Sequence, residues 1–464
     1  MRYLGMAVAL TVPASAFADV TFAILADPAS SFTNPVLMHD PAEPVQLADD
    51  REELDRAIYG KLTGRYRLPD GCTLIVTRSI VRLFVRNECT QQWRGLVRVS
   101  EREWTAGDRV LDANVTQKYS FAPVVGGVSP SLRISNADGS LVTEAVRSDR
   151  YSTEDVSFLA DDGTRLFGTL YVPLGTTRPV AATVMVHGSG PQDRDGFASI
   201  IAVMADAFAA SGRVVLAYDK RGSGMSEGDG DRASFDTLAR DAIAAMAFLR
   251  ARPEVDPTRV GLAGSSQAGW VAARSLELGG EPADVLLLGA AGAALSVREQ
   301  NLYNTDVLMR CAGLSSADRR LALAQQEAFF DFLQHERHAA RLDALTSKAQ
   351  ARPALSEWLF PSSRAVDRTE GAWFNVLAVD YDPLPVWRRF GSRATFLFGE
   401  LDDSTPTASA VQRLRGAGSR VRVLAGGQHL GLIAQDVCTS GLGDLQQFSP
   451  ELFTELERFA RLHQ

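Results

Sequence analysis

Apolar runs of strand length alternate with helical segments over residues 151–464. Some of these runs are almost wholly apolar, which is typical of strands buried on both faces of a sheet. They cover residues 180–186, 214–218 and 285–288, and residues 259–263 form a further strand-like run. Helical spacing separates them at residues 198–211, 235–249 and from 266 to about 278. Strands that alternate with helices predict an α/β fold with a mostly parallel sheet covered on both faces.

The alternation is interrupted after residue 288. Residues 298–381 are helical in texture, and we interpret them as a helical cap inserted into the α/β domain. The alternation then resumes with strand-like runs at 394–398 and 421–424 and helical runs at 408–414 and 450–462. An additional pair of strands, 156–159 and 166–172, is expected to be joined by the turn Asp161-Asp162-Gly163.

Residues 19–150 have a different pattern. A leader that contains several prolines comes first, and short runs rich in β-branched and aromatic residues follow. These runs cover residues 72–77, 81–86, 95–99 and 114–121, and Asp70-Gly71 marks a turn between strands. The pattern predicts a small antiparallel β module that precedes the α/β domain.

Residues 1–18 have the pattern of a signal peptide. Arg2 is followed by an apolar stretch at 4–12, and Ala16-Phe17-Ala18 has the small-x-small form of a cleavage site. An uncleaved anchor is the alternative, but the apolar stretch is short for a bilayer span. We therefore expect an exported protein, periplasmic or extracellular, whose mature chain begins near Asp19.

The composition limits the choice of partner. The 464 residues carry 48 basic and 56 acidic side chains, a formal net charge of -8, with no basic run. A nucleic-acid partner is therefore not expected. Apart from the first residues, no run of about 18 apolar residues predicts a transmembrane helix.

The four cysteines of an exported chain can form disulfides. Cys72 and Cys89 flank two runs that would form a hairpin turning near Ser79-Ile80, which predicts a bridge across its open end. Cys311–Cys438 is inferred only by elimination. Four buried thiols are the alternative, and no pair has metal-ligand spacing.

The sharpest motif is Gly264-Ser265-Ser266-Gln267-Ala268-Gly269, which lies between a predicted strand and a predicted helix. A nucleophile elbow requires this context, with small residues two positions before and after the serine. Gly264 and Ala268 meet that requirement for Ser266, although alanine replaces the usual glycine. Ser265 lacks a glycine two positions before it, and an ordinary helix-capping serine is the other alternative.

A serine nucleophile needs a base, and the base needs an orienting acceptor. Of the six histidines, His429 lies in a glycine-containing loop after a predicted strand. The others lie in the leader, in the cap, beside the C-terminus or in the loop at His187. Asp402 and Asp403 follow the strand at 394–398, and both could orient the base, with Glu400 as a third choice.

Two backbone N–H groups must stabilise the negative charge that develops on the substrate oxygen. Gln267 follows the nucleophile, and Ser189 lies in the loop after the buried strand at 180–186, so these are the expected oxyanion-hole donors. We expect His187 to fix that loop by hydrogen bonds. The glycine-rich residues 218–226 lack the order of a phosphate-binding loop and are interpreted as a structural turn tied by Asp219 and Arg221.

Residues from about 155 to 462 resemble the α/β-hydrolase superfamily, between its acyl-CoA thioesterase-like and prolyl-oligopeptidase-like bacterial branches. The motifs that carry the resemblance are His187-Gly188-Ser189-Gly190-Pro191-Gln192-Asp193-Arg194, Tyr218-Asp219-Lys220-Arg221-Gly222, the Ser266 elbow, Gly399-Glu400-Leu401-Asp402 and His429. The family's Gly-x-x-Asp-x-x-x-Pro form favours Asp402 as the acid. Residues 64–71, 74–76 and 83–85 also resemble β modules appended to some bacterial serine hydrolases.

The resemblance implies hydrolysis through an acyl-enzyme, without a metal or an organic cofactor. An esterase or thioesterase acting on a small molecule is our leading hypothesis. A serine peptidase of prolyl-oligopeptidase-like type, with a short peptide substrate, is the first alternative. There are two further alternatives. One is a non-catalytic binding protein on the same fold, and the other is a protein whose β module binds a surface or a partner.

Overall fold

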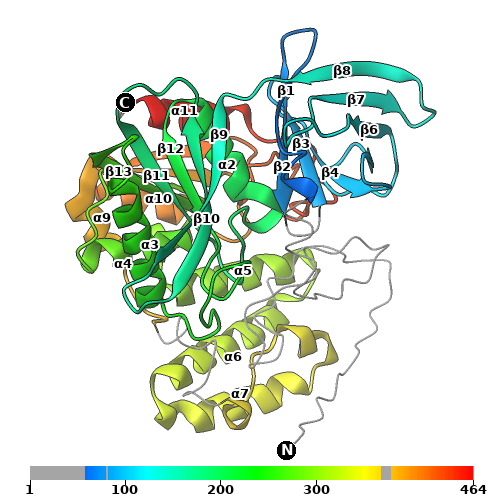
Figure 1. The fold of residues 1–464 in the computed structure, drawn as a ribbon. Helices are drawn as coiled ribbons and strands as arrows, with labels where there is room; N and C mark the ends of the chain where they lie inside the picture. Colours follow the sequence, from blue (N-terminus) through cyan, green and yellow to red (C-terminus); the bar gives the residue numbers. More distant parts are fainter. Residues whose placement is uncertain (1–57, 80–81, 367–377, 463–464) are drawn as a thin grey trace, which may run out of the picture.

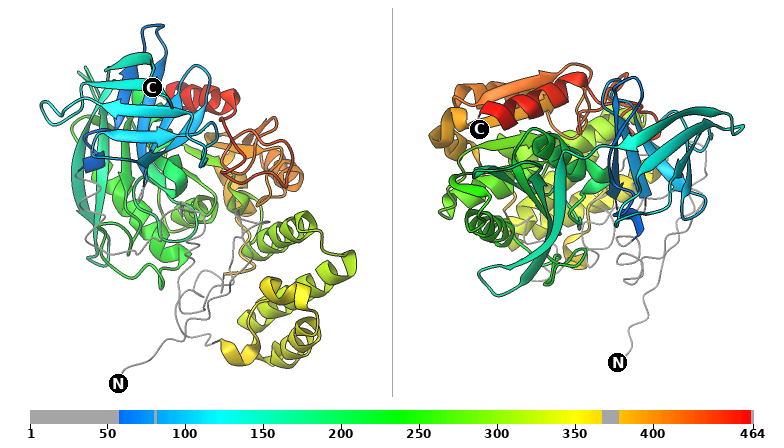
Figure 2. Two further views of the ribbon diagram at one scale, coloured as in Figure 1. Left: turned by 90° about the vertical axis from the view of Figure 1, so that its right-hand side faces the viewer. Right: turned by 45° about the horizontal axis from the view of Figure 1, so that its top comes forward.

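The computed structural model describes residues 58–79, 82–366 and 378–462 (Figure 1). The predicted signal peptide and the leader lie outside these residues. The described chain forms a β-barrel, an α/β domain and a helical cap. Figures 1 and 2 show the cap helices α6 and α7 extending from the α/β domain away from the barrel.

The N-terminal β module is a closed antiparallel barrel in which each strand pairs with the next and β1 pairs with β8. Its strands are β1 (Gly64–Arg67), β2 (Thr73–Ser79), β3 (Arg82–Asn87), β4 (Trp93–Arg98), β5 (Glu103–Ala106), β6 (Gln117–Phe121), β7 (Ser131–Asn136) and β8 (Leu141–Arg147). The predicted antiparallel module is confirmed. Sequence analysis missed β5, β7 and β8. Of these, β8 has only one fully buried residue, so its apolar pattern is weak.

The second sheet has eight strands in the order β16-β15-β14-β13-β11-β12-β10-β9. The first hairpin is antiparallel and β10 pairs antiparallel with β12, while the other pairs are parallel. The strands are β9 (Tyr151–Leu159), β10 (Arg165–Pro173), β11 (Val180–Val186), β12 (Val214–Tyr218), β13 (Val255–Ser265), β14 (Val285–Leu288), β15 (Ala394–Gly399) and β16 (Arg420–Leu424). The mostly parallel sheet predicted from the apolar runs is confirmed.

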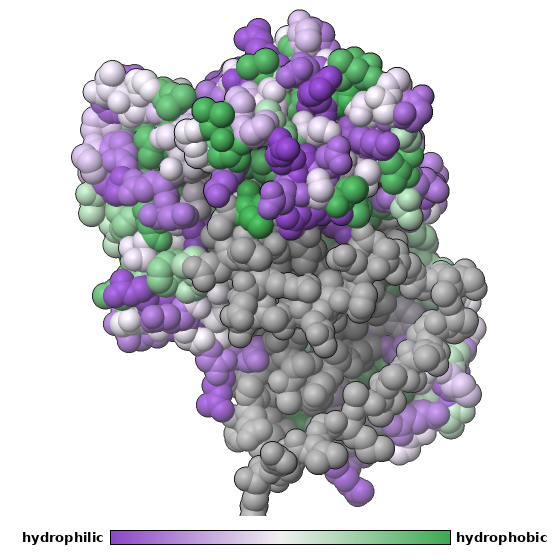
Figure 3. Space-filling view, turned by 45° about the vertical axis from the view of Figure 1, so that its right-hand side comes forward, coloured by the Kyte–Doolittle hydropathy of each residue, from purple (hydrophilic) through white to green (hydrophobic). Residues whose placement is uncertain are grey.

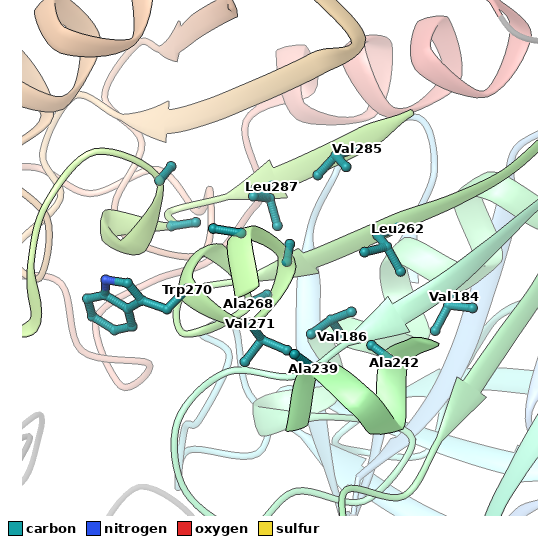
Figure 4. Packing of buried hydrophobic residues seen from close by; sticks show 14 of the residues in the cluster. Val184, Val186, Ala239, Ala242, Leu262, Ala268, Trp270, Val271, Val285 and Leu287 are labelled. Atoms are coloured by element: carbon teal, nitrogen blue, oxygen red, sulfur yellow. The ribbon is translucent and has the colours of Figure 1, made fainter. Parts of the chain in front are cut away.

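Helices cover both faces of this sheet. The helices α3 (Phe235–Arg250), α4 (Ala268–Glu277), α9 (Leu384–Phe390) and α10 (Thr407–Gly416) pack on one face, and α2 (Ile200–Ala210) and α11 (Pro450–Leu462) pack on the other. On β14, Val285 and Leu287 belong to the first core, and Leu286 and Leu288 to the second. Both faces need apolar side chains, which explains the continuous apolar runs. Figure 4 shows Ala268 and Val271 of α4 close to Val186 of β11.

The predicted cap is helical and has its own aromatic core, in which Phe329 and Phe330 pack against Phe360. Its helices are α5 (Val297–Cys311), α6 (Ser316–Gln334), α7 (Ala339–Gln350) and the 3-10 helices η4 (Glu336–His338), η5 (Pro353–Trp358) and η6 (Ser363–Ala365). Three more 3-10 turns, η2 (Phe197–Ser199), η3 (Ala291–Ala293) and η7 (Gly391–Arg393), lie in the α/β domain.

The barrel is joined to the α/β domain by buried contacts. The Trp93 ring lies between Phe84 of the barrel and Phe448 of the segment before α11, with ring centroids 4.7 and 4.8 Å away. The backbone N–H of Trp93 donates to Gln446. Arg65 of β1 forms a buried ion pair with Asp206 of α2, with 2.8 Å between nitrogen and oxygen. The barrel therefore shares part of its core with the α/β domain.

Both expected disulfides are present. Cys72–Cys89 closes the open end of the β2–β3 hairpin. Cys311–Cys438 joins the last residue of α5 in the cap to a loop of the α/β domain.

The surface of the barrel is mixed in character. On the face shown in Figure 3, hydrophobic residues lie among hydrophilic ones over the upper part of the molecule. Single exposed apolar residues of this kind are normal for a folded protein. Among the described helices, none is both long and apolar enough to cross a membrane.

Replacing Trp93 by alanine tests the shared core. We expect Trp93→Ala to lower the free energy of unfolding by about 3–5 kcal/mol, because it leaves a cavity between the two domains. Denaturant unfolding followed by circular dichroism measures this change. The control is Val99→Ala, at a barrel residue that is 62% exposed, which should change the free energy by less than about 0.5 kcal/mol. A loss below about 1 kcal/mol for Trp93→Ala would show that the contact contributes little.

Candidate active site

Ser266 lies in a strained turn between β13 and α4. The strand ends at Ser265 and the helix begins at Ala268. Ser266 has a φ of 55°, in the left-handed region that a residue with a side chain rarely adopts. This is the strand-turn-helix conformation that sequence analysis expects for a nucleophile elbow.

The small residues on either side of Ser266 face one another. A Cβ atom on Gly264 would overlap the carbonyl oxygen of Val186 and lie 2.7 Å from the Cβ of Ala268. Gly264 therefore has no room for a side chain, while the methyl group of Ala268 fits because its opposite residue is glycine. Alanine in place of the usual glycine is thus compatible with the elbow.

His429 and Asp402 form a buried pair. The Nδ1 of His429 lies 3.0 Å from each carboxylate oxygen of Asp402, and the two residues are 6% and 2% exposed. A carboxylate can only accept, so Nδ1 donates and the neutral imidazole keeps Nε2 as its acceptor. The backbone N–H groups of Ser404 and Thr405 also donate to Asp402, each at 2.8 Å, and hold the carboxylate in place.

Asp403 points to other partners. Its carboxylate accepts hydrogen bonds from the hydroxyl groups of Ser404 and Ser440, at 3.0 and 2.8 Å. Burial and the nearby charge of Asp402 raise the pKa of Asp403 above its usual value. The structure thus places Asp402 against His429 and directs Asp403 away from it.

The end of β14 brings Ser266 and His429 together. The N–H of Ser266 donates to the carbonyl of Leu288 at 3.0 Å. The next residue, Gly289, lies against His429, since a Cβ atom there would be 3.1 Å from His429 Nδ1. Gly289 also has a φ of 57°, so both space and conformation call for glycine. Leu288 therefore contacts the backbone of Ser266, and the next residue, Gly289, contacts His429.

The charge of Asp402 raises the pKa of His429. Burial alone would lower the pKa of His429, but the charge of Asp402 and the hydrogen bond to it raise the pKa above the ordinary 6.5. The imidazole is thus more basic than a free histidine, as a proton acceptor for a serine should be.

Two groups of backbone N–H donors lie near the elbow. Gln267 directly follows Ser266, and the loop with Ser189 is adjacent because a Cβ atom on Gly188 would lie 3.5 Å from the Cβ of Ser266. The N–H groups of Ser189 and Gln267 donate to no backbone carbonyl among the described residues. The same holds for Gly188 and Gly190, so this loop offers more than one possible donor.

Lys220 forms hydrogen bonds with both the Ser189 loop and Gln267. Its Nζ donates to the carbonyls of Gly188 and Gly190, each at 2.9 Å, and to the side-chain oxygen of Gln267 at 2.8 Å. A trans peptide points its C=O and N–H in opposite directions, so the bond to Gly188 turns the N–H of Ser189 away from Lys220. Burial lowers the pKa of Lys220 to about 7. Sequence analysis missed this residue, because its acceptors are backbone carbonyls and a glutamine distant in sequence.

The other residues of these loops have structural roles. Asp219 accepts hydrogen bonds from the backbone and guanidinium group of Arg194, and Arg221 pairs with the buried Asp241, so the predicted structural turn is confirmed. His187 is buried, and its burial together with the charge of Lys220 lowers its pKa to about 3. Hydrogen bonds with the backbone of Tyr218 and Asp193 raise the pKa, but by less. A histidine with that pKa is neutral, which fits a residue that fixes the loop.

The cap contacts the loop that carries Asp402 and Asp403. From α5, the hydroxyl of Tyr303 donates to the carbonyl of Asp402, and the side-chain amide of Asn304 donates to the carbonyl of Asp403, both at 3.0 Å. The disulfide Cys311–Cys438 restrains the far end of the same helix. Sequence analysis gave no role to Tyr303 or Asn304, because nothing in a helical insertion indicates which residues face the domain below.

Comparison with known families is consistent with this geometry. A model of the Alpha/beta hydrolase family matches residues 183–438, which is more than half of the chain. The chain belongs to the alpha/beta hydrolase family. The predicted resemblance is therefore confirmed.

The chain is also similar to individual proteins. Thiohydrolase aneE of Aspergillus aculeatus is 35% identical over 119 residues, which are 25% of this chain and 35% of that protein. Polyketide transferase claH of Penicillium crustosum is 28% identical over 179 residues, which are 38% of this chain and 56% of that protein. The chain thus matches between about a third and just over half of the length of these curated relatives.

Solved structures align over a larger part of the chain, with low identity. The alpha/beta hydrolase GrgF from Penicillium sp. sh18 has a TM-score of 0.43 at 20% identity, covering 67% of this chain and 99% of that one. Carboxyl esterase 2 from Tuber melanosporum has a TM-score of 0.40 at 16% identity, covering 68% and 88%.

Replacing Asp402 by asparagine tests the charge pair. We expect Asp402→Asn to lower the pKa of His429, because burial then acts without the opposing carboxylate. The pKa is measured by NMR titration of the histidine ring protons, with His429→Gln used for assignment. Asp403→Asn is the matched control and should lower this pKa less, since Asp403 makes the smallest of the contributions that raise it. An equal effect of both variants would contradict the specific pairing with Asp402.

Proposed function

We propose that this protein is a serine hydrolase that cleaves carboxylic ester or thioester bonds through an acyl-enzyme intermediate. Ser266 is the nucleophile, His429 the base and Asp402 the residue that orients the base. The observation that carries the proposal is the buried His429–Asp402 pair beside the strained elbow of Ser266. Membership of the alpha/beta hydrolase family supports the same reaction class.

The proposed reaction has two halves. His429 accepts the proton of Ser266 as its oxygen attacks the substrate carbonyl, and the resulting imidazolium is stabilised by Asp402. The imidazolium then protonates the departing alcohol or thiol, which leaves an acyl group on Ser266. A water molecule, deprotonated by His429, attacks this acyl group and releases the acid and the free serine. These residues supply every proton transfer, so the scheme needs no metal or organic cofactor.

The oxyanion hole is formed in this proposal by the N–H groups of Ser189 and Gln267. They would donate to the substrate oxygen when it becomes negative in the tetrahedral intermediate. Lys220 acts through them by holding both segments in one arrangement.

Two further observations concern the substrate and the compartment. The Aspergillus relative that is 35% identical over 119 residues is named a thiohydrolase, which supports a thioester as well as an ester substrate. We also propose that the protein is exported, to the periplasm or beyond the cell. The disulfides Cys72–Cys89 and Cys311–Cys438 support this, because such bonds persist mainly in oxidising compartments.

Covalent labelling tests the nucleophile. We expect one fluorophosphonate adduct on the purified protein and none on Ser266→Ala, as measured by intact mass. Ser265→Ala is the matched control and should label like the wild type. An unlabelled wild type, or equal labelling of Ser266→Ala, would refute the assignment of Ser266.

A substrate panel then tests the bond type. Hydrolysis of p-nitrophenyl esters or acyl thioesters, with much slower hydrolysis of an aminoacyl p-nitroanilide, is the expected result. Comparable turnover of the anilide would instead indicate a peptidase.

Replacing Lys220 tests the oxyanion hole. We expect Lys220→Met to lower kcat by about 100-fold, which is typical for loss of one oxyanion donor, with a smaller change in KM. Arg221→Met is the control, because Arg221 ties the same turn to Asp241 and Asp162 and does not contact the Ser189 loop. It should lower the melting temperature and leave kcat within about twofold of the wild type. A similar kcat for both variants would contradict the role of Lys220.

A further inference from the structure

A barrel residue contacts the loop that carries Ser189. Arg78 lies on β2, is 4% exposed, and its Nη2 donates to Asp193 at 2.8 Å and also to Asp195. Burial alone would lower the pKa of Arg78, but Asp195 and Asp193 raise it, so the guanidinium stays charged. The barrel thus places a buried cation on the loop after β11.

The two aspartates need this cation. Asp193 and Asp195 are 1% and 7% exposed, and the N–H of Asp195 donates to the carboxylate of Asp193 at 3.1 Å, so the two side chains share one turn. Two buried carboxylates this close repel each other unless a positive charge lies between them. Removing one partner from a buried ionic cluster leaves an uncompensated charge, which is costly.

A cavity lies beside this end of the loop. It has a volume of about 630 Å³, lies among the described residues between the barrel and the α/β domain, and has Arg78, Arg194 and Asp195 among its lining residues. Asp195 therefore borders this cavity on one side, and its ionic contact with Arg78 lies at that border.

We propose that Arg78 is a positioning residue, through which the barrel holds the oxyanion loop in its active arrangement. This inference rests on the proposed serine hydrolase function. The loop is held by Lys220 at the carbonyls of Gly188 and Gly190, by Asp219 at Arg194, and from the barrel by Arg78 at Asp193 and Asp195. Ser189 belongs to the segment gripped by Lys220. The barrel is then part of the structure that supports catalysis, and an α/β domain without it would have a displaced oxyanion donor.

Arg65 provides a matched comparison. It is also a buried arginine of the barrel, 1% exposed, and pairs with Asp206 of α2. Its contact docks the barrel without touching the loop after β11. Comparing Arg78 with Arg65 therefore separates a role in loop position from a role in docking the barrel.

The experiment measures kcat and KM of the full mature chain on a p-nitrophenyl ester, together with thermal unfolding. We expect Arg78→Met to lower kcat by about 10- to 100-fold with KM within about twofold, since a displacement of about 1 Å costs up to that factor. Both methionine variants should lower the melting temperature by similar amounts. Arg65→Met should nevertheless keep kcat within about threefold of the wild type. Arg78→Lys, which restores the charge, should recover part of kcat. An unchanged kcat in Arg78→Met, or an equal loss of kcat in both methionine variants, would overturn the proposal.

A second variant covers the case in which Arg78→Met does not fold. Asp195→Asn keeps the shape of the side chain and weakens the same contact, so we expect kcat to fall several-fold with KM unchanged. An unchanged kcat in this variant would also overturn the proposal. Failure of the hydrolase function itself is distinguishable, because the wild type would then neither turn over the ester nor be labelled at Ser266.

Discussion

The close contact between the end of β14 and two loops is the constraint on which the proposed site depends. Leu288 accepts the N–H of Ser266, and Gly289 lies directly against His429. Neighbouring parallel strands end at the same edge of a sheet, so residues that follow different strands can meet there. A side chain at position 289 would push His429 away from Ser266.

Buried ion pairs and hydrogen bonds extend this order outward from the site. Asp402 holds His429, Lys220 joins the Ser189 loop to Gln267, and Arg194 joins the same loop to Asp219. Polar and charged groups are costly to bury without a partner, so each contact fixes the position of both partners. These contacts connect the end of the sheet, the Ser189 loop and the following turn as one unit, and the cap and the barrel contact that unit from two sides.

Much of the architecture could be predicted from local patterns. The continuous apolar runs identified the parallel strands, because a strand covered on both faces requires apolar residues at every position. The weakly patterned strand β8 escaped prediction, because most of its residues are not buried. In the site, the elbow was visible because the turn at Ser266 demands small neighbours at fixed spacing, and a glycine-containing loop indicated His429.

The choice between Asp402 and Asp403 shows where local reasoning ends. Both follow the same strand, and only the family's Gly-x-x-Asp-x-x-x-Pro form favoured Asp402. The physical distinction comes from the folded chain, in which Ser440 contacts Asp403 and His429 contacts Asp402. Lys220 and Arg78 act on residues 30 to 117 positions away along the chain. The sequence by itself determined the fold class, the strained serine and the set of possible partners, because steric and hydrophobic requirements repeat at short spacing. Only the tertiary structure decided which charges meet, because a buried ion pair depends on segments that the fold brings together from distant parts of the chain.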